Sequence, residues 1–417
     1  MSLPRYPQYK DSGVEWLGEV PAHWEVVRLR NIVEIKKVIA GELGFEILSI
    51  TQSGIKVKDI ESGEGQLSMD YTKYQVVEIG DFAMNSMDLL TGGVDIASVK
   101  GVTSPDYRVF RIIKSNCCAS RYLLFILINS YLQKIFFAFG QGSAQLGRWR
   151  LPRKEFNAFG VPLPPLPEQT AIAEFLDRET GKIDELVAEQ RRLIGLLKEK
   201  RQAVISHAVT KGLDPNAPMK YSGVEWLGEV PEHWEVLPLK RIVVLQSGNS
   251  ITSERIEEAG HYPVFGGNGL RGFTTDFTHD GDFVLIGRQG ALCGNINYAS
   301  GQFWASEHAI VVTPYQKLEI RWLGEFLRTM NLNQYSISAA QPGLSVEIIR
   351  NLHACLPPKS EQTAISIFLD SELNKFDSLI TEAERAISLL QERRSALISA
   401  AVTGQIDVRA VAERGAA

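Results

Sequence analysis

The sequence predicts an α+β fold in which a long antiparallel intramolecular coiled coil separates two globular α/β domains related by a pseudo-twofold axis. Three observations support this. An apolar heptad stripe runs through residues 168–209, the same element recurs at residues 361–402, and a short motif occurs at residues 12–26 and again at 222–236. The blocks between these elements share little sequence. A duplicated scaffold around two different blocks predicts two related sites with different preferences.

The first long helix is expected to begin after prolines 162, 164, 165 and 167, which fix φ and disfavour a helix. Apolar residues then recur three, four or seven positions apart until Gly212 and Pro215 end the helix. A helix of this length with one apolar stripe needs a partner to cover it. The expected coiled-coil seam contains Leu186, Leu193, Leu197, Leu379, Leu390 and Leu397.

The partner helix is expected within the same chain. Residues 164–177, PPLPEQTAIAEFLD, and residues 357–370, PPKSEQTAISIFLD, are identical at 10 of 14 positions. The short motif, SGVEWLGEVPAHWEV, is identical at 14 of 15 positions in its second copy. No helix precedes the first motif and no motif follows the second helix. Joining residues 403–409 back to residues 9–20 would complete the second repeat, which predicts that the chain ends lie near one another.

The repeats divide the chain into five parts. We expect residues 1–21 to complete the second scaffold repeat, 22–160 to form the first variable domain and 161–221 the central scaffold. Residues 222–353 form the second such domain with its entry motif, and 354–417 the C-terminal scaffold. The expected elements of the two domains are strands at 45–51, 74–77 and 107–113 with a helix at 120–139, and strands at 262–265, 282–286 and 309–313 with a helix at 320–330.

Composition indicates a soluble globular protein of two or three domains, with 417 residues, 44% hydrophobic and 22% charged. We expect it in the cytoplasm and not in a membrane, because it has no long apolar run and no signal peptide. The four cysteines (117, 118, 293 and 355) form no CxxC pair and are expected to be reduced core residues, with no metal and no cofactor. The net charge is −5, so binding to DNA would require local basic patches or a partner subunit.

No catalytic constellation is found. The sequence lacks the Gly-rich cofactor loop and the Asn/Asp-Pro-Pro-aromatic tetrapeptide of a DNA methyltransferase, and it lacks a phosphate-binding loop and a nuclease signature. His23 and His233 lie in the duplicated motif beside Trp24 and Trp234, which favours a structural role. We therefore expect no catalytic residues.

Polar Gly-rich loops are the candidate DNA contacts. Gln and Arg read adenine and guanine edges, and glycine lets the backbone approach phosphates. A Gly-rich turn is more often only a turn, so the argument rests on recurrence of these loops in both blocks. The candidates are Thr51, Gln52, Lys56, Lys58, Gln141, Ser143, Gln145, Arg148 and Arg150 in the first block, and Asn268, Arg271, Arg288, Gln289 and Gln341 in the second.

The chain closely resembles the specificity subunit of type I restriction–modification systems. The resemblance is carried by the doubled SGVEWLGEVPxHWEV motif, the doubled PPxxEQ helix entrance, and AVTKGLDP and AVTGQIDVR at the helix ends. It implies two target-recognition domains, each reading one half of a bipartite, gapped site in double-stranded DNA, with the coiled coil setting the gap. It further implies docking of two methyltransferase (modification) subunits and of restriction (motor-nuclease) subunits, and no catalytic activity in this chain.

Two alternatives stay open at this point. A stand-alone two-site DNA-binding regulator would show a strong basic bias and bind its site unaided. A helical scaffold protein without a DNA role would need no Gly loops that carry Arg and Gln.

Overall fold

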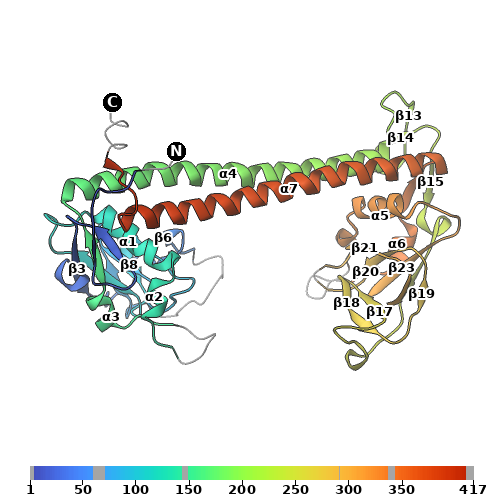
Figure 1. Cartoon of the computed structure of the whole chain (residues 1–417). Coiled ribbons are helices and arrows are strands. Elements are labelled where there is room, and N and C mark those ends of the chain that lie inside the picture. The colour runs from blue at the N-terminus through green and yellow to red at the C-terminus, as the bar shows by residue number, and fades with distance from the viewer. Residues whose placement is uncertain (1–3, 60–70, 143–148, 291, 337–342, 410–417) are drawn as a thin grey trace. The chain divides into compact units, whose positions relative to one another are not determined.

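The computed structural model describes residues 4–59, 71–142, 149–290, 292–336 and 343–409. The chain divides into two compact units. Unit 1 comprises Met1–Gln190 and Arg385–Ala417, and unit 2 comprises Arg191–Glu384 (Figure 1). Unit 1 is therefore discontinuous in sequence, because both ends of the chain belong to it.

Unit 1 is organised around a four-stranded antiparallel sheet with the order β4-β11-β8-β9. Phe82 and Phe110 stack at its centre with ring centroids 5.0 Å apart, and the apolar helix α1 (Ser120–Leu132) lies buried in the same core. The other elements are β1 (Tyr9–Asp11), β2 (Glu19–Pro21), β3 (Glu25–Arg28), β4 (Val33–Lys36), β5 (Leu48–Thr51), β6 (Gly54–Val57), β7 (Gln75–Val77), β8 (Phe82–Met84), β9 (Val94–Ile96), β10 (Gly101–Thr103), β11 (Arg108–Ile112), α2 (Ile135–Ala138), α3 (Arg153–Ala158) and β12 (Gly160–Leu163).

Unit 2 repeats this plan. Its sheet β16-β23-β20-β21 has the same strand order, and it adds a second sheet, β18-β17-β22-β19, in which β17 and β22 run parallel. Its elements are β13 (Met219–Tyr221), β14 (Glu229–Pro231), β15 (Glu235–Pro238), β16 (Val243–Ser247), β17 (Tyr262–Gly266), β18 (Gly269–Thr274), β19 (His279–Asp280), β20 (Phe283–Gly287), β21 (Ile296–Ala299), β22 (Gln302–Ala305), β23 (Ala309–Pro314), α5 (Ile320–Thr329), α6 (Val346–Asn351) and β24 (His353–Leu356). The two blocks thus share a folding pattern despite their different sequences.

Two long helices pack together, α4 (Leu166–Lys211) and α7 (Lys359–Val402). In unit 1 the beginning of α4 faces the end of α7, where Arg394 Nε lies 2.9 Å from Asp184 Oδ1. In unit 2 the end of α4 faces the beginning of α7, where Arg201 Nε lies 3.6 Å from Asp377 Oδ1. The helices are therefore antiparallel, which confirms the predicted coiled coil.

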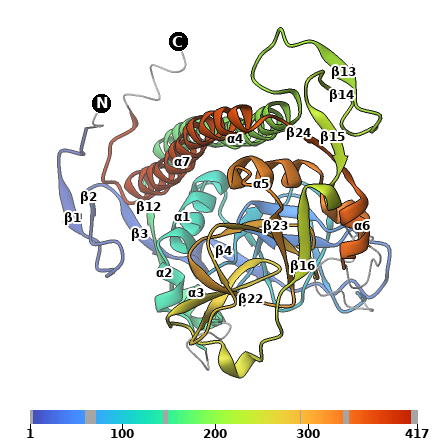
Figure 2. The same ribbon diagram turned by 90° about the vertical axis from the view of Figure 1, so that its right-hand side faces the viewer.

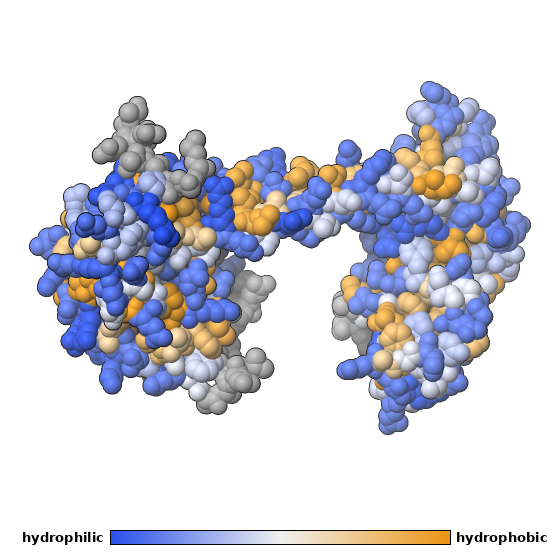
Figure 3. Space-filling view, in the orientation of Figure 1, coloured by the Kyte–Doolittle hydropathy of each residue, from blue (hydrophilic) through white to orange (hydrophobic). Residues whose placement is uncertain are grey.

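The predicted seam is wrong at three positions. Leu186, Leu193 and Leu379 leave 50%, 43% and 48% of their surface exposed, whereas Val187 next to the first is only 8% exposed. The buried stripe of α4 passes through Thr180, whose hydroxyl donates to the Leu176 carbonyl at 2.6 Å. Because its hydroxyl is hydrogen-bonded, this threonine can be buried, but a search for apolar residues at heptad spacing does not find it. The other three predicted positions, Leu197, Leu390 and Leu397, are half-buried, and Figure 3 shows apolar residues on the exposed surface of the helix pair.

Two helix boundaries also differ from expectation. The single helix expected at 120–139 is interrupted, because Lys134 adopts a left-handed conformation with φ of 55° between α1 and α2. Helix α4 begins at Leu166 and includes Pro167, which is tolerated in the first turn because an N–H there has no intrahelical acceptor. No described helix is long and apolar enough to cross a membrane.

The cysteines are free thiols in the structure. Cys118, Cys293 and Cys355 are buried, and burial raises the pKa of the Cys355 thiol to about 12. Cys117 is half-buried. This is the environment expected of core cysteines.

Candidate nucleic-acid interface

The short repeated motif is anchored to the start of a long helix. In unit 1, Trp24 Nε1 donates to Glu168 Oε1 at 3.0 Å, and His23 Nε2 lies 2.8 Å from Glu168 Oε2. In unit 2, Trp234 Nε1 donates to Glu361 Oε2 at 2.9 Å, and the His233 ring nitrogen Nε2 lies 2.6 Å from Oε1. Both histidines therefore make structural contacts, as the sequence predicted.

The glutamine of each EQ pair holds the entrance of the recognition block. Gln169 Oε1 accepts the Ala119 N–H at 2.9 Å, directly before α1, and Nε2 donates to the Pro164 carbonyl at 2.8 Å. Gln362 Oε1 accepts the Glu319 N–H at 3.1 Å, directly before α5. A buried amide with all of its partners satisfied fixes the geometry on both sides.

The aspartate of each repeated FLD triplet binds the first turn of the recognition-block helix that precedes the long helix in the sequence. Arg121 on α1 donates twice to Asp177, with distances of 2.8 and 2.6 Å to Oδ1, and this bonding raises the pKa of Arg121. On α5, Arg321 Nε lies 3.0 Å from Asp370 Oδ1. These pairs fix α1 against α4 in unit 1 and α5 against α7 in unit 2 (Figure 2).

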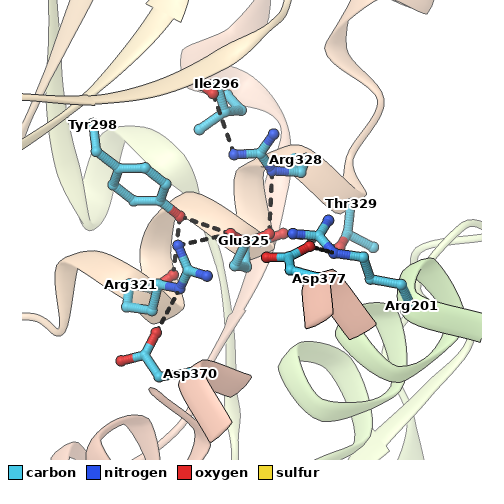
Figure 4. Close-up of polar contacts among 9 residues, drawn as sticks. All are labelled: Arg201, Ile296, Tyr298, Arg321, Glu325, Arg328, Thr329, Asp370 and Asp377. Atoms are coloured by element: carbon cyan, nitrogen blue, oxygen red, sulfur yellow. Dashed lines mark hydrogen bonds and ion pairs between the residues drawn. The ribbon is translucent and has the colours of Figure 1, made fainter. Parts of the chain in front are cut away.

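Unit 2 extends this contact into a charged network (Figure 4). Glu325 is only 2% exposed and lies between Arg321 and Arg328, at 3.4 and 3.1 Å. The Tyr298 hydroxyl donates to Glu325 at 3.1 Å, and burial raises the pKa of Tyr298 above its ordinary value. The buried carboxylate is thus paired from three sides, as a charge in a core must be.

In unit 2 the predicted DNA-contacting residues meet at one end of the central sheet. Asn268 lies in the turn between β17 and β18, Arg271 follows on β18, and Arg288 and Gln289 leave β20. A Cβ on Gly267 would approach the Gln289 carbonyl to 3.2 Å, and one on Gly266 would approach Arg271 Cδ to 2.5 Å. The glycines therefore allow the turn that carries Asn268 to pack against the loop after β20 that carries Gln289.

His308 belongs to this cluster and was not among the predicted residues. Its Nδ1 lies 3.0 Å from Gln289 Oε1, and its Nε2 lies 3.3 Å from Glu307 Oε1. Two of the expected strands, 282–286 and 309–313, pair with each other in the structure. Because Gly287 pairs with Ala309, the residues after the first strand and before the second must be neighbours.

In unit 1 the corresponding loops also converge. The Thr51 carbonyl lies 2.2 Å from the position of a Cβ on Gly93, so the β5–β6 turn that carries Thr51 and Gln52 packs on the start of β9. Gln141 and Arg150 exchange both backbone hydrogen bonds, at 2.9 and 3.0 Å. Leu151 N donates to the Ser86 carbonyl after β8 at 2.9 Å, as Leu344 N does to the Arg288 carbonyl in unit 2.

The remaining candidates are placed as follows. Lys56 is exposed on β6, and Lys58 follows that strand. Ser143, Gln145, Arg148 and Gln341 lie outside the described residues.

One buried cation supports the loop surface of unit 1. Arg108 is 8% exposed, donates to the Leu151 carbonyl at 2.9 Å and lies 4.5 Å from the Phe156 ring centroid. Burial, together with the nearby charges of Arg150 and Arg153, lowers the pKa of Arg108 to about 10. Among the residues that the structure describes, no three His, Cys, Asp or Glu side chains gather as metal ligands.

The comparisons with known proteins all identify the same family. The family model of the type I restriction modification DNA specificity domain matches twice, at residues 21–192 and 231–388. The EcoprrI type I restriction enzyme specificity subunit of Escherichia coli is 45% identical over 157 residues, which is 36% of this chain and 38% of that protein. A putative specificity subunit of Haemophilus influenzae is 28% identical over 138 residues, which is 32% of this chain and 36% of that protein. These two matches thus span little more than a third of either relative.

Other matches run over nearly the whole chain. The MjaVIII type I restriction enzyme specificity subunit of Methanocaldococcus jannaschii is 23% identical over 431 residues, 94% of each protein. A chain from a structural study of complex assembly in the type I R-M system has a TM-score of 0.68 at 17% identity, covering 92% of this chain and 98% of that one. The HsdS subunit from Thermoanaerobacter tengcongensis has a TM-score of 0.51 at 17% identity, with the same coverage of 92% and 98%. The double match of the family model, together with the doubled scaffold described above, shows that the chain belongs to the type I restriction modification DNA specificity domain family.

Proposed function

We propose that the chain is the DNA sequence-recognition subunit of a type I restriction–modification complex and reads a bipartite, gapped site in double-stranded DNA. One observation carries the proposal. The scaffold contacts of Glu168, Gln169 and Asp177 recur in unit 2 at Glu361, Gln362 and Asp370, whereas the loops at the ends of β8 and β20 differ. Two domains that share the same scaffold contacts but carry different loops are suited to recognise two different half-sites.

The recognition domains of this proposal are residues 22–160 and 222–353, each reading one half-site. The scaffold regions are residues 1–21, 161–221 and 354–417. The exposed Arg271 and the half-buried Arg288 of unit 2, and the exposed Arg150 of unit 1, are the candidates for reading base edges or binding phosphates.

The partners of this proposal are two methyltransferase (modification) subunits and the restriction (motor-nuclease) subunits. The Escherichia coli and Methanocaldococcus jannaschii relatives are named as specificity subunits of type I restriction enzymes. A duplicated scaffold offers two equivalent docking positions for identical subunits. The chain itself would supply recognition and its partners the chemistry, in the cytoplasm.

A domain exchange tests the proposal. Residues 22–160 are replaced by the recognition domain of a relative, and the reciprocal chimera replaces residues 222–353. Each chimera, co-expressed with the modification subunit, should alter one half of the modified sequence and leave the other unchanged, as read by methylome sequencing. Changes in both halves, or an unaltered site, would refute separate readers.

A second measurement addresses the stand-alone regulator. The isolated chain and the assembled complex are titrated with the same DNA site. With a net charge of −5, we expect the complex to bind far more tightly than the chain alone. Equal affinity would favour the regulator, and no co-purifying methyltransferase would favour the scaffold protein.

A further inference from the structure

The carboxylate that anchors the repeated motif in unit 1 is covered by a tyrosine. Tyr6 is 3% exposed, and its ring centroid lies 5.7 Å from the rings of both His23 and Trp24. The Arg409 guanidinium lies 5.0 Å from the Tyr6 ring centroid. As a result the side chain of Glu168 is only 6% exposed.

The same position in unit 2 has no tyrosine. Ala22 N donates to the Gln8 carbonyl in unit 1, and Glu232 N donates to the Pro218 carbonyl in unit 2, so the two segments are in register. This register places Asn216 where unit 1 has Tyr6. The side chain of Glu361 is 37% exposed, about six times the exposure of Glu168.

A cavity of about 240 Å³ lies beside this exposed carboxylate. Its apolar lining comes from the residues Leu213, Ala217, Pro231 and Ile365. Its polar lining includes Asp214, His233, Glu361 and Lys211, and the Lys211 ammonium donates to the backbone carbonyls of Leu227 and Glu229. An engineered apolar cavity of about 150 Å³ is enough to bind benzene, so the volume suits an aromatic side chain. The two carboxylates favour a cation beside the ring, the role that Arg409 has in unit 1.

Exposed apolar side chains occur in the cavity lining, at Leu213, and on strand β13, where Met219 pairs with the lining residue Pro231. Leu213, Met219 and Tyr221 are 41%, 38% and 69% exposed. On the matching strand β1 of unit 1, Tyr9 and Asp11 stand in the places of Met219 and Tyr221. Only Tyr221 is therefore replaced by a polar residue in unit 1, and an exposed aromatic side chain that one copy of a duplicated scaffold has and the other lacks marks a surface for another molecule.

The missing ring cannot come from the rest of this chain. The residues outside the described part of the structure, 1–3, 60–70, 143–148, 291, 337–342 and 410–417, include no Phe, Tyr or Trp. Tyr6 of a second copy would have to leave its own buried site. A partner protein is therefore the source that fits.

We propose that the cavity beside His233 docks an aromatic side chain, flanked by Arg or Lys, on an extended segment of a partner protein. The contact imitates in trans what Tyr6 and Arg409 do within unit 1. The docking site does not involve the loops proposed to read DNA, so its test is independent of the proposed recognition function.

The first test uses p-cresol, which is the tyrosine side chain alone, as a probe of the full-length protein. The indole N–H signals of Trp24 and Trp234 are followed by NMR with isotope-labelled tryptophan. We expect p-cresol to shift the Trp234 signal, because that N–H is bound to Glu361 at the cavity, and to leave Trp24 unchanged. In a Tyr6→Ala variant the Trp24 signal should respond as well.

Cavity variants provide the matched control. Ala217→Phe fills the cavity from its own lining and should abolish the response of Trp234, whereas Ala217→Ser should keep it. A response of both indoles or of neither in the unmodified protein would overturn the proposal, as would a response that survives Ala217→Phe. Circular dichroism of each variant verifies that the fold is retained.

The second test asks whether a segment of chain can bind. A synthetic peptide with the sequence of residues 2–12 contains Tyr6, the ring that fills the site in unit 1, flanked by the basic residues Arg5 and Lys10. It should shift the Trp234 signal, and replacement of its Tyr6 by Ala should weaken binding roughly tenfold or more, the loss typical of an aromatic anchor. Equal binding of the two peptides, or no binding of either, would refute an aromatic docking site.

Discussion

Trp24 donates its indole N–H to the carboxylate of Glu168 at 3.0 Å, across 144 residues of sequence. Both groups are buried, at 0% and 6% exposure. The short motif and the first turn of the long helix are thereby joined at one point. The second copy of this bond, between Trp234 and Glu361, is more open to water.

This difference predicts unequal effects of the same substitution. Glu168→Ala leaves a buried indole N–H without an acceptor, which should cost unit 1 about 1–3 kcal/mol. Glu361→Ala should cost unit 2 less, because the carboxylate that it removes is 37% exposed, so that water can take its place. Hydrogen–deuterium exchange of peptides that cover residues 20–30 and 230–240 measures each effect separately. Equal losses of protection would contradict the inequality.

The helix pair offers a second comparison between adjacent residues. Val187→Asp places an unpaired charge in the buried stripe and should destabilise unit 1 by about 3–5 kcal/mol. Leu186→Asp, one residue earlier and half exposed, should cost much less. Thermal unfolding followed by circular dichroism gives both values. A larger effect at Leu186 would restore the leucine seam expected from the sequence.

The helix pair also shows which parts of the fold could be predicted from the sequence. The duplication predicted both the helix pair and the two domains, because a repeat can be recognised in the sequence without any knowledge of side-chain packing. The exact seam was missed because Thr180 continues the buried stripe without an apolar side chain. The loop cluster was found in part. Residues of one loop could be chosen by type, but the neighbourhood of His308 and Gln289 depends on strand pairing.

The loop residues give a third prediction. In the assembled complex, Arg271→Ala or Arg288→Ala should weaken binding to the DNA site by about 1–3 kcal/mol and relax one base position if the side chain reads a base. If the side chain binds a phosphate, all sequences should weaken alike and the salt dependence should become shallower. Arg350→Ala, at an exposed site where Arg350 pairs with Glu347 on α6, is the control. Unchanged affinity for both loop variants would show that the loops lie away from DNA.

His308 predicts a subtler effect. Its contact with Gln289 fixes the orientation of an amide that could read a base edge. His308→Ala should therefore broaden the sequence preference of one half-site more than it lowers the affinity. Binding to a set of oligonucleotides varied at each position measures this. A uniform loss over all oligonucleotides would indicate only a structural role.

The helices give a prediction about the gap between half-sites. Seven residues inserted after Leu197, with seven more after Leu379 near the Arg201–Asp377 pair, add a heptad to both helices and preserve the seam. Each helix grows by roughly 10 Å, which corresponds to about three base pairs of rise. The modified sequence should gain a gap of that size without a change in either half-site. An unchanged gap in the methylome of a folded variant would show that the helix does not set the spacing.

The two ends of the chain meet in unit 1, where Asp407 N donates to the Pro4 carbonyl at 2.8 Å and the Tyr9 hydroxyl donates to the Gly404 carbonyl at 2.9 Å. This contact has a consequence for synthesis on the ribosome. Unit 2 is continuous and can fold as soon as residue 384 has emerged, but unit 1 waits for residues 385–409. The domain that is made first is completed last, so a nascent chain carries the open hairpin of β1 and β2 until residue 409 has emerged.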